Sequence, residues 1–276
     1  MIMKRFFFIF VAAVLLLTPI SAFALAVPEP DLSELADRKS IADRLNDLIR
    51  RIRDGQITRE TARSRVQHLL TEASDYYYKA GGADTPKSEW YFPLAGSDLR
   101  AIPKGKRHGY YARGYDFYEG NLHKGHPSLD IFIPDRNQKC RDDRTGKPVQ
   151  VLSITSGVVV ATEDNWETGD RLRGGRYLWV YDPGNDILVY YAHNESILVK
   201  AGDLVRPGDS IATVGRSGYN AAKRRSPTHL HLTVLKVNRG RMTPIDVYSD
   251  IIKTKVKKRN YDRTTTQTPQ HTRVHG

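Results

Sequence analysis

Two histidines stand two positions apart in a segment that has the composition of a β-strand. His229 and His231 lie within residues 228–234, where β-forming residues dominate and apolar and polar side chains alternate. Side chains at positions i and i+2 of a strand point to the same face. Two imidazoles there could bind one metal ion, or one could bind the metal while the other transfers protons. The chain holds 9 histidines, so such a pair can arise by chance and the chemistry requires further partners.

A second pair of possible ligands lies upstream. His126 is flanked by glycine and proline, and Asp130 opens the apolar run 130–133. A carboxylate at the start of an apolar strand is unfavourable unless it is paired or bound to a metal. Catalytic zinc commonly takes three protein ligands and leaves one position open. Two histidines and one carboxylate would give such a site a net positive charge, which favours ionisation of a bound water and polarisation of a carbonyl. His193, which ends the strand-like run 187–192, is a further candidate.

Together these segments resemble the lysostaphin-like (LytM-type) zinc metallopeptidases, which cut peptidoglycan cross-links. The pattern of that family is His-x-x-x-Asp, then Tyr-x-His, then His-x-His. Here the same order is found at residues 126–130, 191–193 and 229–231, and the resemblance covers roughly residues 90–247. Glycine-rich segments that frame the motifs in the family also match, at 155–159, 201–209 and 214–218.

The resemblance implies a role for each motif residue. His126, Asp130 and His231 would bind one zinc ion, and His193 and His229 would be the unligated catalytic pair that positions or deprotonates the water and stabilises the oxyanion. The implied activity is zinc-dependent endopeptidase hydrolysis of the peptide cross-links of bacterial peptidoglycan by a metal-activated water. Spacing alone leaves open which of His229 and His231 binds the metal; the family supplies that assignment.

Three features depart from the usual pattern of the family. Residues 127–129 read Pro-Ser-Leu instead of containing the usual glycine, and Asn194 replaces the usual leucine after His193. The loop 135–146 is longer and more charged, and its Cys140, the single cysteine of the chain, is expected to be an exposed thiol. We expect these departures to affect substrate fit more than metal binding.

The first residues have the features of an export signal. Lys4 and Arg5 precede the apolar run 6–17, and small residues then offer cleavage after Ala24 or Ala26. The alternative is an uncleaved membrane anchor, but the run is shorter than the ~20 residues that a spanning helix needs. The expected location is therefore periplasmic, extracellular or in the cell wall, with no stable membrane span after cleavage.

The chain divides into five parts by sequence pattern. Residues 1–26 are the expected signal peptide, residues 27–80 an α-helical hairpin with apolar positions at helical spacing, and residues 81–89 a linker. Residues 90–250 contain many short strand-like runs between turn residues, which predicts a mainly β fold, a compact antiparallel β-sandwich or barrel-like domain. The resemblance implies that this is the zinc metallopeptidase domain. Residues 251–276 are basic, poor in apolar residues and predicted to be a disordered tail.

The charge of the chain bears on its partners. The net charge is +12, and residues 251–276 contribute seven Lys or Arg against one acid, Asp262. A basic exported protein is attracted to polyanions such as peptidoglycan, whereas nucleic acid is disfavoured because no nucleic-acid motif is visible. The basic residues ahead of the His-x-His segment could hold anionic stem peptides or belong to a solvated loop: Arg216, Lys223, Arg224 and Arg225.

Two classes of function fit these observations. The first is the peptidoglycan endopeptidase. The second is a non-catalytic LytM-like activator of cell-wall amidases, or a cell-wall binding protein, for which the helical hairpin could contact a protein regulator or occlude the groove. Degenerate members of the family typically lack motif residues, and all five are present here, which favours the enzyme.

Overall fold

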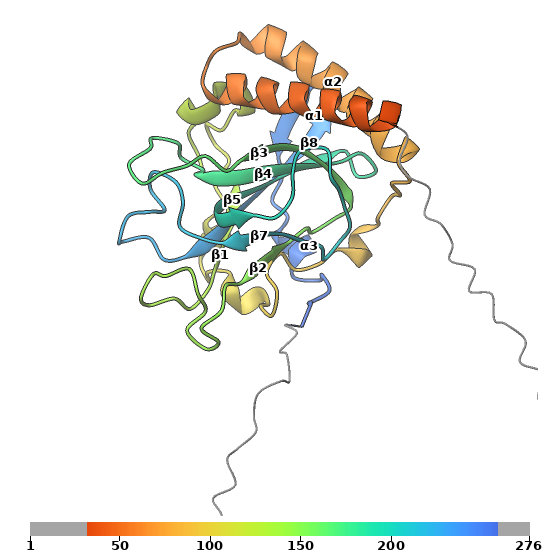
Figure 1. The fold of residues 1–276 in the computed structure, drawn as a ribbon. Helices are drawn as coiled ribbons and strands as arrows, with labels where there is room; N and C mark the ends of the chain where they lie inside the picture. Colours follow the sequence, from red (N-terminus) through yellow and green to blue (C-terminus); the bar gives the residue numbers. More distant parts are fainter. Residues whose placement is uncertain (1–31, 259–276) are drawn as a thin grey trace, which may run out of the picture.

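The computed structural model describes residues 32–258, with the side chains of the first helix described from Ile41 onward (Figure 1). The expected signal peptide at 1–26 and residues 259–276 of the expected tail lie outside this part of the chain. Within residues 32–258, no helix has the length and apolar content that crossing a membrane requires.

Two antiparallel helices begin the described part of the chain, as predicted. They are α1 (Leu32–Arg53) and α2 (Arg59–Lys79). Thr58 caps α2, because its side chain accepts a hydrogen bond from the backbone N–H of Thr61. Each helix buries one apolar stripe: Leu45, Leu48, Ile49 and Ile52 in α1, and Ala62, Val66, Leu69, Leu70, Ala73 and Tyr77 in α2.

Short antiparallel strands make up the rest of the molecule, with a few single-turn helices in the connections. The strands are β1 (Ser128–Phe132), β2 (Gln150–Leu152), β3 (Gly157–Glu163), β4 (Arg176–Asp182), β5 (Ile187–Ile197), β6 (Leu204–Val205), β7 (Ser210–Val214), β8 (His229–Asn238) and β9 (Arg241–Pro244). The short helices are η1 (Lys87–Glu89), η2 (Leu99–Ala101), η3 (Lys106–Gly109), η4 (Phe117–Leu122) and α3 (Tyr248–Ile251). The predicted antiparallel β domain with a preceding helical hairpin is confirmed.

The long strand β5 joins two layers of the sheet. The main path runs β1-β8-β5-β4-β3-β6, and β7 pairs with both β2 and β5. Along its first part β5 pairs with β4 and β8, whereas Ser196 and Ile197 near its end pair with β7. A register shift between Asn194 and Ser196 marks the change of partner. Because one strand serves both layers, the sheet curves around a single core.

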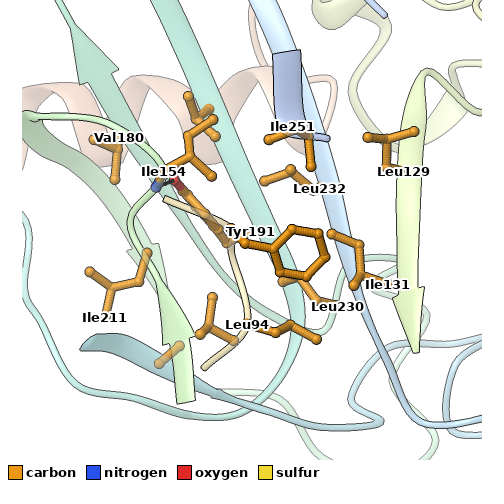
Figure 2. Close-up of a cluster of buried hydrophobic side chains, with 14 of the residues drawn as sticks. Leu94, Leu129, Ile131, Ile154, Val180, Tyr191, Ile211, Leu230, Leu232 and Ile251 are labelled. Atoms are coloured by element: carbon orange, nitrogen blue, oxygen red, sulfur yellow. Dashed lines mark hydrogen bonds between the residues drawn. The ribbon is translucent and has the colours of Figure 1, made fainter. Parts of the chain in front are cut away.

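That core fills the space between the two layers (Figure 2). Leu129 and Ile131 of β1 meet Leu230 and Leu232 of β8, and each is at most 1% exposed. Tyr191 of β5 lies among them, and its hydroxyl accepts a hydrogen bond from the backbone N–H of Ile154 at 2.9 Å. The tyrosine of the Tyr-x-His motif is therefore a core residue that anchors β5.

The helical hairpin packs on the other face of the same sheet (Figure 1). Successive residues of β4 alternate between the faces, so that Val180 enters the core whereas Trp179 lies on the hairpin side. At the end of α1, Arg53 Nη1 lies 2.6 Å from Glu163 Oε2 of β3. Residues 81–89, expected to be a linker, connect the hairpin to the β domain; most of them are exposed, but Thr85 is buried and bonds to Ser156.

The predicted disordered tail begins too early at residue 251. Ile251 is 1% exposed, and the backbone of Lys255 pairs with the segment 90–92 through the N–H of Phe92 and the carbonyl of Trp90, both at 2.8 Å. Residues 251–258 therefore belong to the folded domain. Chiefly backbone hydrogen bonds attach these residues to the domain, and their polar side chains do not indicate this attachment.

Cys140 is buried rather than exposed, which corrects the sequence-based expectation. The side chain of Asp135 folds the polar loop around it by accepting hydrogen bonds from the backbone N–H groups of Lys139 and Cys140, at 3.0 and 2.8 Å. Burial raises the pKa of the thiol to about 12. A thiol that remains protonated at neutral pH is a poor nucleophile.

Candidate metal site

The pairing of β1 with β8 brings the two sequence motifs together. Asp130 stands directly opposite His231, and Phe132 stands opposite His229. Directly paired residues of antiparallel strands have their side chains within contact distance on one face. Leu230 and Leu232 turn into the core, so His229 and His231 share the opposite face, as their spacing predicts.

Three of the predicted site residues converge on one point. The potential ligand atoms of His126, Asp130 and His231 all lie within 4.8 Å of one another. Asp130 Oδ1 is 3.3 Å from His126 Nε2 and 3.1 Å from His231 Nδ1. Two imidazoles and one carboxylate are a donor set that catalytic zinc sites use.

The second nitrogen of each of these imidazoles has its own partner. His126 Nδ1 donates to the carbonyl oxygen of Gly109 at 3.1 Å, which leaves Nε2 as the acceptor. His231 Nε2 lies 2.6 Å from Ser128 Oγ, which leaves Nδ1 toward Asp130. Such contacts fix the tautomer and the ring orientation of a metal-binding histidine. The residues present therefore fit a zinc ion held by His126 Nε2, Asp130 and His231 Nδ1.

The charges in this cluster are strongly coupled. Burial opposes ionisation of Asp130, but its close contacts with the imidazoles of His126 and His231 hold its pKa well below the usual range. Burial opposes protonation of His126, yet the Asp130 carboxylate raises its pKa overall. For His231, burial dominates and lowers the pKa. The carboxylate is thus ionised and surrounded by imidazole nitrogens.

The two remaining predicted residues lie beside the cluster. His193 Nδ1 donates to the carbonyl oxygen of Ser217 at 2.8 Å, and His229 Nδ1 donates to that of Pro227 at 2.7 Å. Their ring centroids are 4.9 Å apart. His229 Nε2 is 3.9 Å from Asp130 Oδ1. Both rings therefore keep Nε2 as an available acceptor near the three possible ligands.

His193 is neutral at ordinary pH. Burial and the neighbouring imidazoles of His229 and His231 lower its pKa well below the usual value. A neutral imidazole beside a reacting water is able to accept a proton.

A clamp of hydrogen bonds holds the backbone at His193. This residue has φ 66°, a left-handed conformation that is uncommon for residues other than glycine. Asn194 is fully buried, and its Nδ2 donates to the carbonyl oxygens of Arg176 and Tyr191 at 3.1 and 3.0 Å. Ser217 Oγ donates to the carbonyl oxygen of Asn194 at 2.7 Å. The amide that replaces the usual leucine thus stabilises the bulge that orients His193.

All five residues line one cavity of about 580 Å³, which we call the groove. Ile49, Ile52 and Arg53 of α1 contribute to its lining. A wall of aromatic residues that pack in the same cluster as Ile49 and Ile52 also lines the groove: Tyr115, Phe117, Tyr177, Trp179 and Tyr190. The sequence patterns gave no sign of this wall or of the Asn194 clamp, because both depend on contacts between distant segments.

The basic residues ahead of the His-x-His segment have different positions. Arg216 is buried, and its guanidinium donates to the backbone carbonyls of Ser226 and Lys223. It therefore stabilises the loop and is not available to a substrate. Arg225 lines the groove, whereas the adjacent Arg224 does not.

The comparisons with known proteins agree with the motifs. Residues 141–246 match the family model described as peptidase family M23. The outer membrane antigenic lipoprotein B of Histophilus somni is 47% identical over 55 residues, which are 20% of this chain and 16% of that protein. The murein hydrolase activator NlpD of Salmonella dublin is 32% identical over 90 residues, 32% of this chain and 22% of that protein. This chain thus spans less than a quarter of the length of either relative.

Similar solved structures include two peptidases. The catalytic domain of lysostaphin from Staphylococcus simulans is 23% identical, with 53% of this chain and 90% of that chain covered and a TM-score of 0.34. A putative glycyl-glycine endopeptidase LytM from Ruminococcus gnavus is 21% identical, with 82% and 90% covered and a TM-score of 0.40. The family match itself includes His193, His229 and His231 but begins after Asp130. The resemblance to the lysostaphin-like peptidases is confirmed, and residues 141–246 of this chain match the model of peptidase family M23.

Proposed function

We propose that the protein is a zinc-dependent endopeptidase that hydrolyses the peptide cross-links of bacterial peptidoglycan. The observation that carries this proposal is the arrangement of five side chains in one groove: three possible ligands within 4.8 Å of one another, and two further imidazoles beside them. The match to peptidase family M23 supports this class of reaction, and the complete set of motif residues supports catalysis.

In this proposal His126, Asp130 and His231 hold one zinc ion. A bound zinc ion supplies Lewis-acid polarisation of a carbonyl and lowers the pKa of water. The chain itself supplies the orientation. Gly109 and Ser128 fix the rings of the two histidines, so little reorganisation is needed for the three ligands to bind.

His193 and His229 act as the proton-handling pair. Each has its Nδ1–H committed to a backbone carbonyl, so each presents Nε2 as a base. One imidazole removes a proton from the attacking water and can then protonate the leaving amine, whereas the other, once protonated, can donate a hydrogen bond to the oxygen that develops negative charge. His193 and His229 carry these two roles jointly.

The proposed location is the periplasm, the extracellular space or the cell wall. The expected signal at residues 1–26 supports export, and the net charge of +12 favours binding to an anionic polymer. The hairpin remains the proposed contact for a protein regulator.

A second candidate function is a non-catalytic activator of cell-wall amidases. The similarity to the murein hydrolase activator NlpD favours it. An activator needs no complete metal cluster, and therefore the presence of all three possible ligands makes the enzyme the preferred proposal.

The test is hydrolysis of purified peptidoglycan by the zinc-loaded protein, with and without a chelator, followed by mass spectrometry of the released peptides. The enzyme releases uncross-linked peptides, and the chelator abolishes this activity. If the zinc-loaded protein releases nothing alone but increases the activity of a purified cell-wall amidase with or without the chelator, the second function holds and the first is wrong.

A further inference from the structure

We propose that Arg173 and Arg225 make the groove selective for peptides that carry free carboxylates close to the scissile bond. This inference rests on the proposed function and adds the chemical class of the substrate. It arises from the charges that line the groove, from the hydrogen bonds that hold the guanidinium of Arg173, and from those that fix the backbone of the loop that carries Arg225.

The charged lining of the groove is mostly positive. Besides the histidines, it contains three arginines and one acid, Asp130. Arg53 is neutralised, since it pairs with Asp54 at 2.7 Å and with Glu163 at 2.6 Å. Arg173 and Arg225 have no acidic partner among residues 41–258. The groove therefore offers two positive charges that the protein itself does not compensate.

Arg173 is held in place from the loop between β3 and β4. Its Nη1 donates to the carbonyl oxygens of His123 and Asn121, at 2.8 and 3.3 Å. Burial and then the charge of Arg173 lower the pKa of His123, which places the guanidinium close to the turn that carries His126. Its remaining N–H groups make no hydrogen bond within the described part of the chain, so a fixed donor group faces the groove.

Arg225 reaches the groove from the loop between β7 and β8. Arg216 fixes the backbone of this loop by donating to the carbonyls of Ser226 and Lys223, and Gln138 Nε2 donates to that of Arg224 at 2.8 Å. The loop thus holds Arg225 at the groove lining and leaves Arg224 exposed outside it.

A guanidinium group distinguishes a carboxylate from its amide. It binds both carboxylate oxygens through parallel N–H donors and gains from the opposite charge, whereas a carboxamide offers one neutral acceptor. A substrate that carries carboxylates next to the cross-link would therefore be recognised better than its amidated counterpart. We expect a preference of about tenfold in kcat/KM, the usual size for one charge-assisted contact of about 1.4 kcal/mol.

The experiment compares two synthetic cross-linked peptides that differ in one position, glutamate or glutamine beside the cross-link. The wild-type protein should hydrolyse the glutamate form with about tenfold higher kcat/KM. Arg225→Gln should remove most of this preference, chiefly by raising KM for the glutamate form. Arg224→Gln is the matched control, because it removes the neighbouring charge outside the groove, and it should keep the preference.

Binding separates this inference from the proposed function. Calorimetric affinities of both peptides for the zinc-loaded His229→Ala variant, with and without Arg225→Gln, report recognition without turnover. Stronger binding of the glutamate form that disappears with Arg225→Gln supports the inference even if the wild-type protein hydrolyses neither peptide, in which case only the proposed function fails. Equal binding of the two peptides, or an equal loss for both with Arg225→Gln, overturns the inference.

Arg173 requires a conservative variant, because its side chain also holds a loop. Arg173→Lys retains the charge without the planar fork. It should lower the preference for the glutamate form while the unfolding temperature and zinc content remain those of the wild type. An unchanged preference in this variant removes Arg173 from the proposal.

Discussion

The two groups of imidazoles in the groove differ in what holds each ring. His126 and His231 each direct one nitrogen to Asp130 Oδ1, at 3.3 and 3.1 Å. His193 and His229 each direct Nδ1 to a backbone carbonyl, at 2.8 and 2.7 Å. All four residues line the same groove, so residue type and location do not separate them.

His126 also directs its Nδ1 to a backbone carbonyl, that of Gly109 at 3.1 Å, so the difference lies in the distance to the carboxylate: 3.3 and 3.1 Å for His126 and His231, against 3.9 Å for His229. A ring that faces a carboxylate already points to the place where a cation is stabilised. A ring that is tethered through Nδ1 to a carbonyl, and whose Nε2 does not contact the carboxylate closely, keeps Nε2 for proton transfer. The comparison therefore supports a division of roles between metal binding and proton handling. Variants that alter one group of histidines, or the contacts around it, test this division.

The largest effect is expected from His231→Ala, which removes one of the three convergent ligands. Activity on peptidoglycan should fall to background, and excess zinc should not restore it, because His126 and Asp130 alone bind the metal too weakly. Turnover measured over a range of zinc concentrations checks this. Full activity in the variant at any zinc concentration would remove His231 from the ligand set.

His229→Ala acts on the other group and should have the next largest effect. Removing a positioned base should lower kcat by ~10²–10⁴-fold while zinc is retained. Steady-state kinetics at saturating zinc provide the measurement. His68→Ala is a matched control, because that imidazole is exposed on the hairpin, and it should leave kcat unchanged. Normal turnover in His229→Ala would contradict its proposed role.

Asn194→Leu tests whether the clamp of the second group matters for its orientation. The change removes the donor to Arg176 and Tyr191 and inserts the residue that is usual in the family. We expect kcat to fall about tenfold, because a less well oriented His193 would stabilise the transition state by about 1.4 kcal/mol less. KM and zinc content should be unchanged. If kcat is retained while the unfolding temperature falls, the clamp serves stability only.

The smallest effect on turnover is expected from Glu163→Gln, which weakens the contact between the hairpin and the sheet. Arg53 and Glu163 are 19% and 7% exposed, so loss of the charge should reduce the free energy of unfolding by about 1–3 kcal/mol. Chemical denaturation measures this, with the exposed Glu60→Gln as control. An increase in kcat would instead indicate that the hairpin restricts access to the groove.

Local patterns in the sequence were sufficient to predict part of this arrangement. Alternation places His229 and His231 on one face, and the apolar periodicity of residues 41–77 gives the hairpin. The order of the motifs also led to Asp130 and His193. These inferences succeed because each depends on a few neighbouring residues or on a family pattern.

Contacts between segments that are distant in the sequence could not be predicted from such local patterns. The sequence neighbours of Cys140 are polar, but Cys140 is buried because its loop folds around the side chain of Asp135. Arg216 and Arg225 are equally basic in sequence, yet one binds backbone carbonyls and the other lines the groove. The backbone pairing of Lys255 with residues 90–92 has no side-chain signature. Hydrogen bonds of this kind become apparent only in the folded chain.

The division of roles is tested most directly by the zinc content of two variants, His231→Ala and His229→Ala, after equilibrium dialysis against zinc. The account predicts one zinc ion per chain in His229→Ala, as in the wild type and the His68→Ala control, and none in His231→Ala. Retention of zinc by His231→Ala, or its loss from a folded His229→Ala, would contradict the assignment of the two histidines.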